Sequence, residues 1–246
     1  MFIGLGTILN VLAIVIGSVL GILIGHRLSD KTSKVVTDGL GLVVLVLGGM
    51  NVLAIADPAL TSAVGAGIPL LIVIFAILLG GILGSALKIE ERLEKLGHFL
   101  QSRLVRAENA NEEKFITGFV NASLVFTIGP LAILGALSDG LGNGIDQLLT
   151  KSILDGFASL AFAASLGWGV ALSALPVGIW QGLLTLVGFA MGSTMPDALI
   201  AALTATGGGL LLGVGLRLLQ IRAVAVGNML PALIFAPLIT FLITLL

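Results

Sequence analysis

The chain has 246 residues, of which 57% are hydrophobic and only 10% are charged, and its formal net charge is −1. A soluble globular domain carries about 25% charged residues, so this composition, with a mean hydropathy of +1.18, predicts a polytopic membrane protein. The small net charge gives no reason to expect a nucleic-acid partner. The absence of cysteine excludes disulfides, thiolate metal sites and cysteine nucleophiles.

Eight hydrophobic segments are long enough to cross a bilayer as helices, which predicts an all-α bundle of about eight spans. The first segment has no basic region before it and no small-residue cleavage site after it, so it is predicted to be a retained span. The fifth and sixth are separated only by the turn at Pro176, and their joint length favours two spans over one kinked element. The predicted spans are 3–25, 37–56, 66–87, 115–137, 152–174, 177–194, 198–216 and 223–246.

The distribution of lysine and arginine supports eight spans. Eleven of the 12 basic residues lie in the connections after spans one, three and seven, which share one side of the membrane. Only Lys151 lies on the other side. Because basic residues favour the cytoplasmic side, both termini are predicted to be extracytoplasmic. Merging the segments around Pro176 into one span would place Arg217 and Arg222 outside the cytoplasm.

The connection at 88–114 is a sizeable polar segment within what is otherwise a single transmembrane domain covering 1–246. Apolar residues recur in it at helical spacing from Leu87 to Leu104, with charges between them. It is predicted to continue the third span into an amphipathic cytoplasmic helix that lies on the membrane surface or packs on a partner subunit. Its charges are interpreted as ordinary solvated-face charges, among them Glu90, Arg92, Glu94 and Lys95.

Two glycine patterns indicate how the spans pack. Gly17, Gly21 and Gly25 form a small-residue ridge of the kind that lets helix backbones approach closely. In a comparison of the chain with itself at a shift of 167 residues, Gly21, Gly25, Asp30 and Thr37 meet Gly188, Gly192, Asp197 and Thr204. Spans one to three would then correspond to spans six to eight in the opposite direction, an inverted repeat typical of secondary transporters. Chance matching among 34 glycines is the alternative.

Asp155 is the residue that most strongly suggests a function. It lies in a stretch from Ser152 to Pro196 that holds no other charge, inside the predicted fifth span. A carboxylate in a bilayer is costly and often marks an ion or proton pathway. Lys151 precedes it by one helical turn and could pair with it. The interpretations are a coupling carboxylate, a carboxylate satisfied by helix packing, and a residue just outside the membrane boundary.

The fourth span holds a second group of polar residues. Asn121, Ser123 and Thr127 precede the Gly129-Pro130 pair, which interrupts the helical hydrogen-bond ladder and frees backbone carbonyls. Broken helices of this kind line substrate or ion sites in transporters, and a simple kink is the alternative. Further polar side chains inside or beside spans, each of which alone more often bonds to a neighbouring helix than to a ligand, are Asn10, Asn51, Gln181, Gln220 and Asn228.

Signatures of enzymes and metal sites are missing from the sequence. The Gly- and Asp-rich run 138–146 resembles a calcium loop but lacks the acidic spacing and closing glutamate of an EF-hand. It is predicted to be an extracytoplasmic or re-entrant loop. His26 and His98 are the only histidines, and no P-loop, Gly-x-Ser-x-Gly or His-Glu-x-x-His motif occurs. We therefore expect no catalytic residues, no cofactor and no metal.

Three stretches resemble a known family: Gly6–Asn10, Thr127–Gly135 and Lys151–Gly156. On these stretches the chain resembles the YqgA/YdfK-like family of bacterial inner-membrane proteins, known as domain of unknown function 554. The resemblance covers nearly the whole chain. The resemblance implies a multi-pass protein of the bacterial plasma membrane, sometimes labelled a transporter. It implies no particular substrate.

The favoured hypothesis is a secondary transporter or permease for an unidentified small solute, coupled to protons or another ion. The alternatives are an ion or solute channel and a non-transporting scaffold or regulator that acts through 88–114. Expected partners are the lipid bilayer, the solute or ion and, as an option, a second copy of the chain. The residues expected to serve as coupling, helix-breaking or contact groups are Asp155, Lys151, Asn121, Thr127, Gly129, Pro130 and Gln181.

Overall fold

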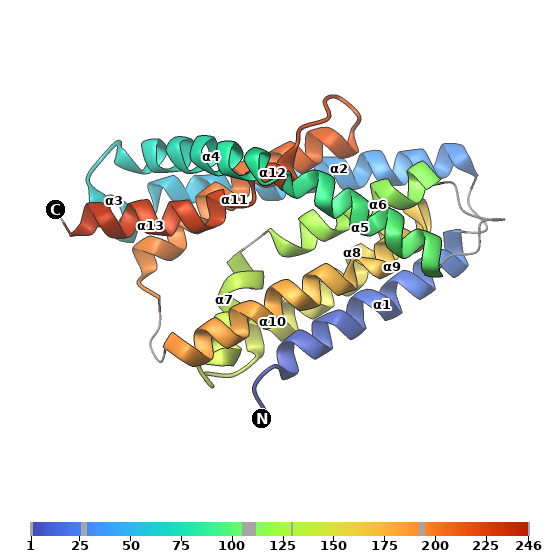
Figure 1. Ribbon diagram of the computed structural model, residues 1–246, viewed down its shortest axis with the longest axis horizontal. Coiled ribbons are helices and arrows are strands. Elements are labelled where there is room, and N and C mark those ends of the chain that lie inside the picture. Colours follow the sequence, from blue (N-terminus) through green and yellow to red (C-terminus); the bar gives the residue numbers. More distant parts are fainter. Residues whose placement is uncertain (1, 26–28, 105–111, 129, 192–194, 246) are drawn as a thin grey trace. The chain divides into compact units, whose positions relative to one another are not determined.

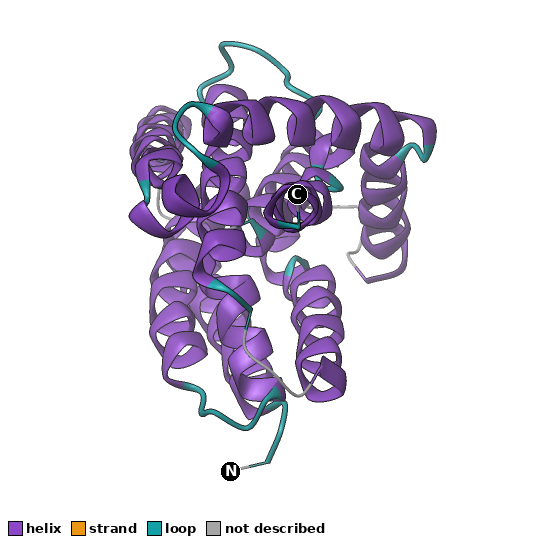
Figure 2. Ribbon diagram, turned by 90° about the vertical axis from the view of Figure 1, so that its left-hand side faces the viewer, coloured by secondary structure: helices purple, strands orange, loops and turns teal. Residues whose placement is uncertain are grey.

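The computed structural model describes residues 2–25, 29–104, 112–128, 130–191 and 195–245. Every regular element among these residues is a helix, and no strand occurs in them (Figure 2). Over the same residues, 7 helical segments are long and apolar enough to cross a membrane, and a bent pair of helices provides an eighth if it forms one span. The predicted all-α bundle is therefore confirmed.

The first of two compact units contains the described residues of 1–40, 93–127 and 131–194. Figure 1 shows α1 running beside α8 and α10 in this unit. Helices α6 and α7 are bent by 61° relative to each other. The helices of the unit are α1 (Leu5–Gly25), α6 (Glu112–Thr127), α7 (Pro130–Gly140), α8 (Asp146–Leu166), α9 (Trp168–Leu172) and α10 (Ala174–Met191).

Glycines bring α1 against α8, backbone to backbone. A Cβ atom added at Gly17, Gly21 or Gly25 would collide with a backbone carbonyl oxygen of α8. The three carbonyls belong, in the same order, to Gly156, Leu160 and Ala164, so the two helices run parallel. The close approach predicted for this glycine ridge is confirmed.

We expect Gly21→Leu to lower thermal stability strongly, because the side chain can be accommodated only if α1 and α8 move apart. Overpacking of this kind costs about 1–3 kcal/mol or more. Gly182→Leu is the matched control, since a Cβ at Gly182 in α10 would meet no atom within 4 Å. Melting temperatures of the purified variants in detergent measure the effect. Equal losses for both variants would contradict the close-packing interpretation.

The second unit contains the described residues of 41–92, 128–130 and 195–246. Two helices are shared between the units: α2 (Asp30–Val52), which continues into the short 3-10 helix η1 (Leu53–Ala56), and α5 (Ile89–Leu104). The other helices are α3 (Pro58–Val64), α4 (Ile68–Ala86), α11 (Asp197–Leu218), α12 (Val226–Met229) and α13 (Ala232–Thr244).

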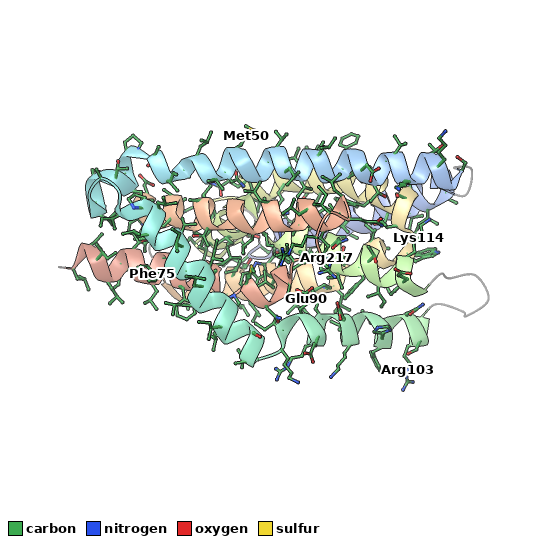
Figure 3. The ribbon with its side chains drawn as sticks, turned by 90° about the horizontal axis from the view of Figure 1, so that it is seen from above. Met50, Phe75, Glu90, Arg103, Lys114 and Arg217 are labelled. Carbon is green, nitrogen blue, oxygen red and sulfur yellow. The ribbon has the colours of Figure 1, made fainter. Side chains whose placement is uncertain are left out.

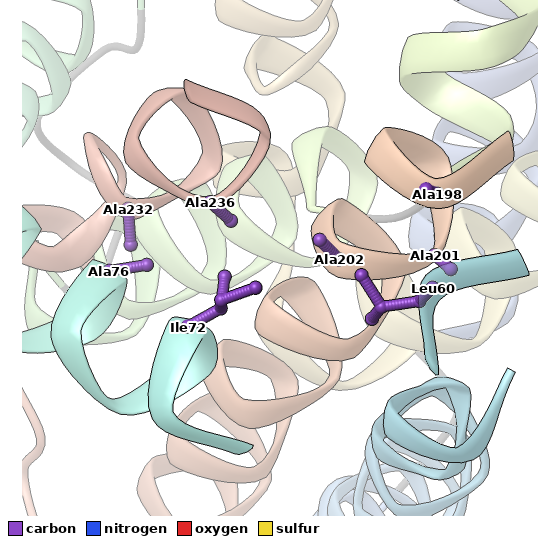
Figure 4. Packing of buried hydrophobic residues seen from close by; sticks show 8 residues of the cluster. All are labelled: Leu60, Ile72, Ala76, Ala198, Ala201, Ala202, Ala232 and Ala236. Atoms are coloured by element: carbon purple, nitrogen blue, oxygen red, sulfur yellow. The ribbon is translucent and has the colours of Figure 1, made fainter. Parts of the chain in front are cut away.

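Small apolar side chains form a buried cluster in this second unit (Figure 4). They come from α3, α4, α11 and α13, and most are alanines, which allow helices to approach closely. The residues of the cluster are Leu60, Ile72, Ala76, Ala198, Ala201, Ala202, Ala232 and Ala236.

Helices α2 and α11 run antiparallel and meet at two pairs of glycines. A Cβ at Gly48 would lie 2.9 Å from the carbonyl oxygen of Gly208, and a Cβ at Gly215 would lie 3.1 Å from that of Gly41. The starts of α2 and α11 are 167 residues apart in the sequence, and Gly41 and Gly208, like Gly48 and Gly215, are separated by the same number. If α2 and α11 are equivalent helices of a repeat, the contact of Gly41 with Gly215 is therefore equivalent to the contact of Gly48 with Gly208. An inverted repeat requires this equivalence. Superposition of the full spans one to three on six to eight stays a prediction.

The boundary between the fifth and sixth spans lies at Gly167, and the prediction of a turn at Pro176 was wrong. Helix α8 ends at Leu166, and Gly167 has a φ of 77°, which a glycine adopts at little cost. Pro176 lies in the first turn of α10, where backbone N–H groups have no intrahelical partner and a proline is tolerated. The two spans are thus 146–166 and 168–190.

Candidate functional site

A buried ion pair lies near the middle of α8. Lys151 Nζ donates a hydrogen bond to Asp155 Oδ2 at 2.5 Å, and both side chains are at most 10% exposed. The pairing predicted from their spacing of four residues is therefore present. Asp155 follows the start of α8 by nine residues, or about 13 Å along a helix of about 31 Å. Lys151 lies one helical turn closer to the start of α8.

Two amides from other helices extend this ion pair. Asn10 of α1 donates through Nδ2 to Asp155 Oδ2 at 3.0 Å and to Gln181 Oε1 of α10 at 3.2 Å. Both amide side chains belong to residues that are 0% exposed. We call Lys151, Asp155, Asn10 and Gln181 the polar chain. It connects three helices in the interior of the first unit.

The helical repeat explains why these residues face inward. Thr7, Asn10 and Ile14 follow one another on the buried face of α1, three or four residues apart. In α8 the same spacing places Lys151, Asp155 and Ser159 on the buried face. The polar groups therefore occupy core positions that apolar residues would otherwise fill.

Two further contacts flank the polar chain. The hydroxyl oxygens of Thr7 and Thr185 lie 3.5 Å apart, which continues the line of polar groups between α1 and α10. Lys151 Nζ also lies 6.0 Å from the centre of the Phe126 ring of α6, within the range of a cation–π contact. The ammonium group is therefore stabilised by a carboxylate and an aromatic ring.

The polar chain retains unused hydrogen-bonding groups. Asn10 Oδ1 and Gln181 Nε2 are buried and have no hydrogen-bond partner in the part of the protein that the structure describes. An unsatisfied buried polar group costs about 1–3 kcal/mol, and folded proteins keep few of them. Asn10 therefore keeps one free acceptor and Gln181 one free donor beside the buried ion pair.

The fourth span contributes less to this site than the sequence suggested. Thr127 Oγ1 donates to the carbonyl oxygen of Ser123 at 2.7 Å, within its own helix. Asn121 is fully buried, and neither of its amide atoms has a partner among the described residues. Gly129 lies outside the described residues, and Pro130 is the first residue of α7. The predicted contact of Asn121 and Thr127 with Asp155 is not present as a hydrogen bond in the described structure.

A second buried carboxylate, Asp139, caps the first helix. Its two carboxylate oxygens accept hydrogen bonds from the backbone N–H groups of Gly4 at 3.1 Å and Gly6 at 3.0 Å. A carboxylate at this position satisfies free N–H groups and interacts favourably with the helix dipole. The prediction of a loop over 138–146 was wrong at its start, because α7 continues to Gly140.

No group of three or more His, Cys, Asp or Glu side chains able to hold a metal ion occurs among the described residues. The two oxygens of Asp139 are occupied by backbone donors of α1 instead.

A second ion pair lies in the second unit, between Glu90 and Arg217 (Figure 3). Glu90 Oε2 accepts a hydrogen bond from the backbone N–H of Gly227 at 2.8 Å, and the backbone N–H of Glu90 donates to Asn228 Oδ1 at 2.9 Å. Glu90 is only 9% exposed, so its interpretation as a solvated-face charge was wrong.

The third span also does not continue into α5 as predicted. Helix α4 ends at Ala86, and Lys88 has a φ of 52°, a left-handed conformation that few non-glycine residues adopt. The chain therefore turns between α4 and α5. This turn precedes Glu90 directly and positions its carboxylate for Arg217 and Gly227.

The described residues form helices without strands, seven segments of which are long and apolar enough to cross a membrane, and they enclose a buried ion pair; these features define a polytopic membrane protein. This chain belongs to the family described as "Protein of unknown function (DUF554)", whose model matches residues 5–241. The family resemblance inferred from three short stretches is thereby confirmed.

Two relatives cover almost the whole chain. It is 31% identical over 239 residues to the uncharacterized membrane protein YdfK of Bacillus subtilis (strain 168), with 97% of this chain and 96% of that protein covered. It is 31% identical over 235 residues to the uncharacterized protein YqgA of Escherichia coli (strain K12), with 94% of each covered. No solved structure matches the chain.

Proposed function

We propose that this protein is a secondary transporter or permease that moves a small solute across the bacterial plasma membrane together with a proton or another ion. The polar chain carries the proposal. It combines a buried ion pair in mid-span with amides of two other helices, and it keeps an acceptor and a donor unpaired. Ionisable groups at such depth are rare and characteristic of substrate and ion pathways.

Asp155 and Lys151 supply a mechanism for ion coupling. Both groups lie on α8, so a movement of α1 leaves the pair together but breaks the hydrogen bond from Asn10 to Asp155 and opens the carboxylate to an ion. A solute that bonds to the same pair then couples its own binding to that of the ion.

The glycine pairs between α2 and α11 support a transporter more than a channel. Alternating access requires two related halves that move around a site, and inverted repeats provide them. The exchange of the two glycine pairs under a shift of 167 residues is the pattern that such a repeat produces. A scaffold acting through 88–114 has less support, because the first turn of α5 is held within the chain itself by Glu90.

Uptake by proteoliposomes tests the proposal. The purified protein is reconstituted and supplied with a panel of labelled solutes, with and without a pH gradient. We expect accumulation of at least one solute that depends on the gradient. Rapid equilibration of ions without accumulation would favour the channel, and a protein that moves none of the solutes would contradict transport.

We expect both termini to be extracytoplasmic and α5 to be cytoplasmic, because eleven of 12 basic residues lie in the connections assigned to one side. The chain contains no cysteine, so single cysteines report their side of the membrane without background. Ser102→Cys, on an exposed position of α5, and a cysteine added after Leu246 should react with an impermeant maleimide from opposite sides of the cell membrane. Labelling of both from the same side would contradict eight spans.

A further inference from the structure

We infer that the polar chain binds a small zwitterion, a solute that carries one ammonium and one carboxylate group, as amino acids do. The inference rests on the proposed transport function and names its substrate class. Two properties of the polar chain lead to it: its balance of charge and its balance of hydrogen-bond donors and acceptors.

The charges of the polar chain cancel. Lys151 contributes one positive charge, Asp155 contributes one negative charge, and the two amides are neutral. A solute with a net charge would bring an uncompensated charge into this buried site, which is unfavourable in a low-dielectric interior. While Asp155 and Lys151 are both charged, a zwitterion adds no net charge to the site, so it meets no such penalty.

The hydrogen-bonding groups also match both ends of a zwitterion. The acceptors are the Asp155 carboxylate and Asn10 Oδ1, and the donors are the Lys151 ammonium and Gln181 Nε2. The ammonium group of the solute would bond to the acceptors and its carboxylate to the donors. The solute would thus replace the ion pair between Lys151 and Asp155 by two ion pairs, one with each of these residues. An uncharged solute would use the two free amide atoms but leave the ion pair without a role.

The close packing of the polar chain favours a small solute. Its members bond directly to one another at 2.5, 3.0 and 3.2 Å, so a ligand enters only when these contacts open. A ligand that then reaches both amides and both charges has to be small, of the size of glycine or alanine.

Thermal stabilisation of the purified protein tests the ligand class directly. The twenty protein amino acids and β-alanine are screened first, at neutral pH. A matched set of similar size then varies the charge: glycine as zwitterion, glycinamide as cation, glycolate as anion and glycolamide as neutral solute. We expect at least one amino acid to raise the melting temperature in a saturable way, and its cationic, anionic and uncharged analogues to have no effect. A set in which no amino acid binds, or in which an analogue with net charge binds better, would overturn the inference.

Apolar variants connect the binding to the polar chain. Asn10→Leu removes the free acceptor and Gln181→Leu the free donor, each together with the bond between the two amides, and each should weaken the apparent affinity about tenfold. Thr240→Val is the control, because this buried hydroxyl in the second unit donates only to Ala236 of its own helix. Unchanged affinity in both leucine variants would place the ligand elsewhere and overturn the inference.

Uptake separates this inference from the proposed function. Gradient-dependent uptake restricted to uncharged or net-charged solutes would support transport and overturn the zwitterion site. Saturable binding of an amino acid without uptake would support the site and contradict transport. Gradient-dependent uptake of the same amino acid that stabilises the protein would support both.

Discussion

Asp155→Asn is expected to abolish gradient-dependent uptake and to lower thermal stability, and adding Lys151→Met should restore stability but not uptake. Removal of one partner from a buried ion pair costs about 3–5 kcal/mol, because the other charge stays buried without compensation. Asp155→Asn leaves the Lys151 ammonium group buried without its carboxylate. The double variant removes both charges, so most of the lost stability returns, while the carboxylate proposed to couple the ion is still missing.

Melting temperatures in detergent and uptake by proteoliposomes measure the two effects separately. Asp146→Asn is the matched control, because Asp146 lies in the first turn of the same helix and is exposed to solvent. It should change neither quantity by much. Comparison of Asp155→Asn with Asp146→Asn therefore shows whether an effect is specific to the buried site or follows from removing any carboxylate of α8.

A purely structural ion pair makes a different prediction. In that case the double variant would recover uptake along with stability, since packing would be the only role of the two charges. Full uptake by a folded Asp155→Asn variant would falsify the coupling role. Loss of uptake in a double variant as stable as the parent would support it.

The bundle could be predicted from the sequence because its signals are local. Each span is a continuous apolar stretch, and pairing of Lys151 with Asp155 follows from one helical turn. The remainder of the site is not local. Asn10 is 145 residues from Asp155 and 171 residues from Gln181. A single amide in a span usually bonds to a neighbouring helix, and only the packing of α1 shows which neighbour it meets.

The errors in the sequence-based interpretation have a common physical cause. Glu90 and Asp139 stand near helix ends, and the sequence assigned Glu90 to a solvated helix face and Asp139 to a loop. Both carboxylates instead accept hydrogen bonds from backbone N–H groups near helix starts that are far away in the sequence. Likewise, Pro176 looked like the stronger helix breaker, but a proline in a first turn disrupts no hydrogen bond, and Gly167 ends the preceding helix. The backbone partners of Glu90 and Asp139 can be identified only from the tertiary structure.

Glu90→Gln is expected to destabilise the protein strongly, although sequence reasoning assigns Glu90 to the solvated face of α5. Its carboxylate compensates Arg217 and accepts a hydrogen bond from Gly227, and the two charged side chains are only 12% and 18% exposed. Loss of the negative charge leaves the guanidinium group partly buried without this partner. The cost should be about 3 kcal/mol, the lower end for buried pairs, because some solvent reaches both side chains.

Glu91→Gln provides a control one residue away. The Glu91 side chain is 54% exposed and its carboxylate lies 3.8 Å from Lys88 Nζ, so its loss should change stability by less than about 1 kcal/mol. The double variant Glu90→Gln with Arg217→Met should recover much of the lost melting temperature, because the guanidinium group that lost its carboxylate is removed as well. Equal effects of Glu90→Gln and Glu91→Gln would show that Glu90 behaves as the surface charge its sequence position suggests. A large loss of melting temperature for Glu90→Gln alone, reversed by adding Arg217→Met, would establish that this ion pair stabilises the contact between the start of α5 and the end of α11.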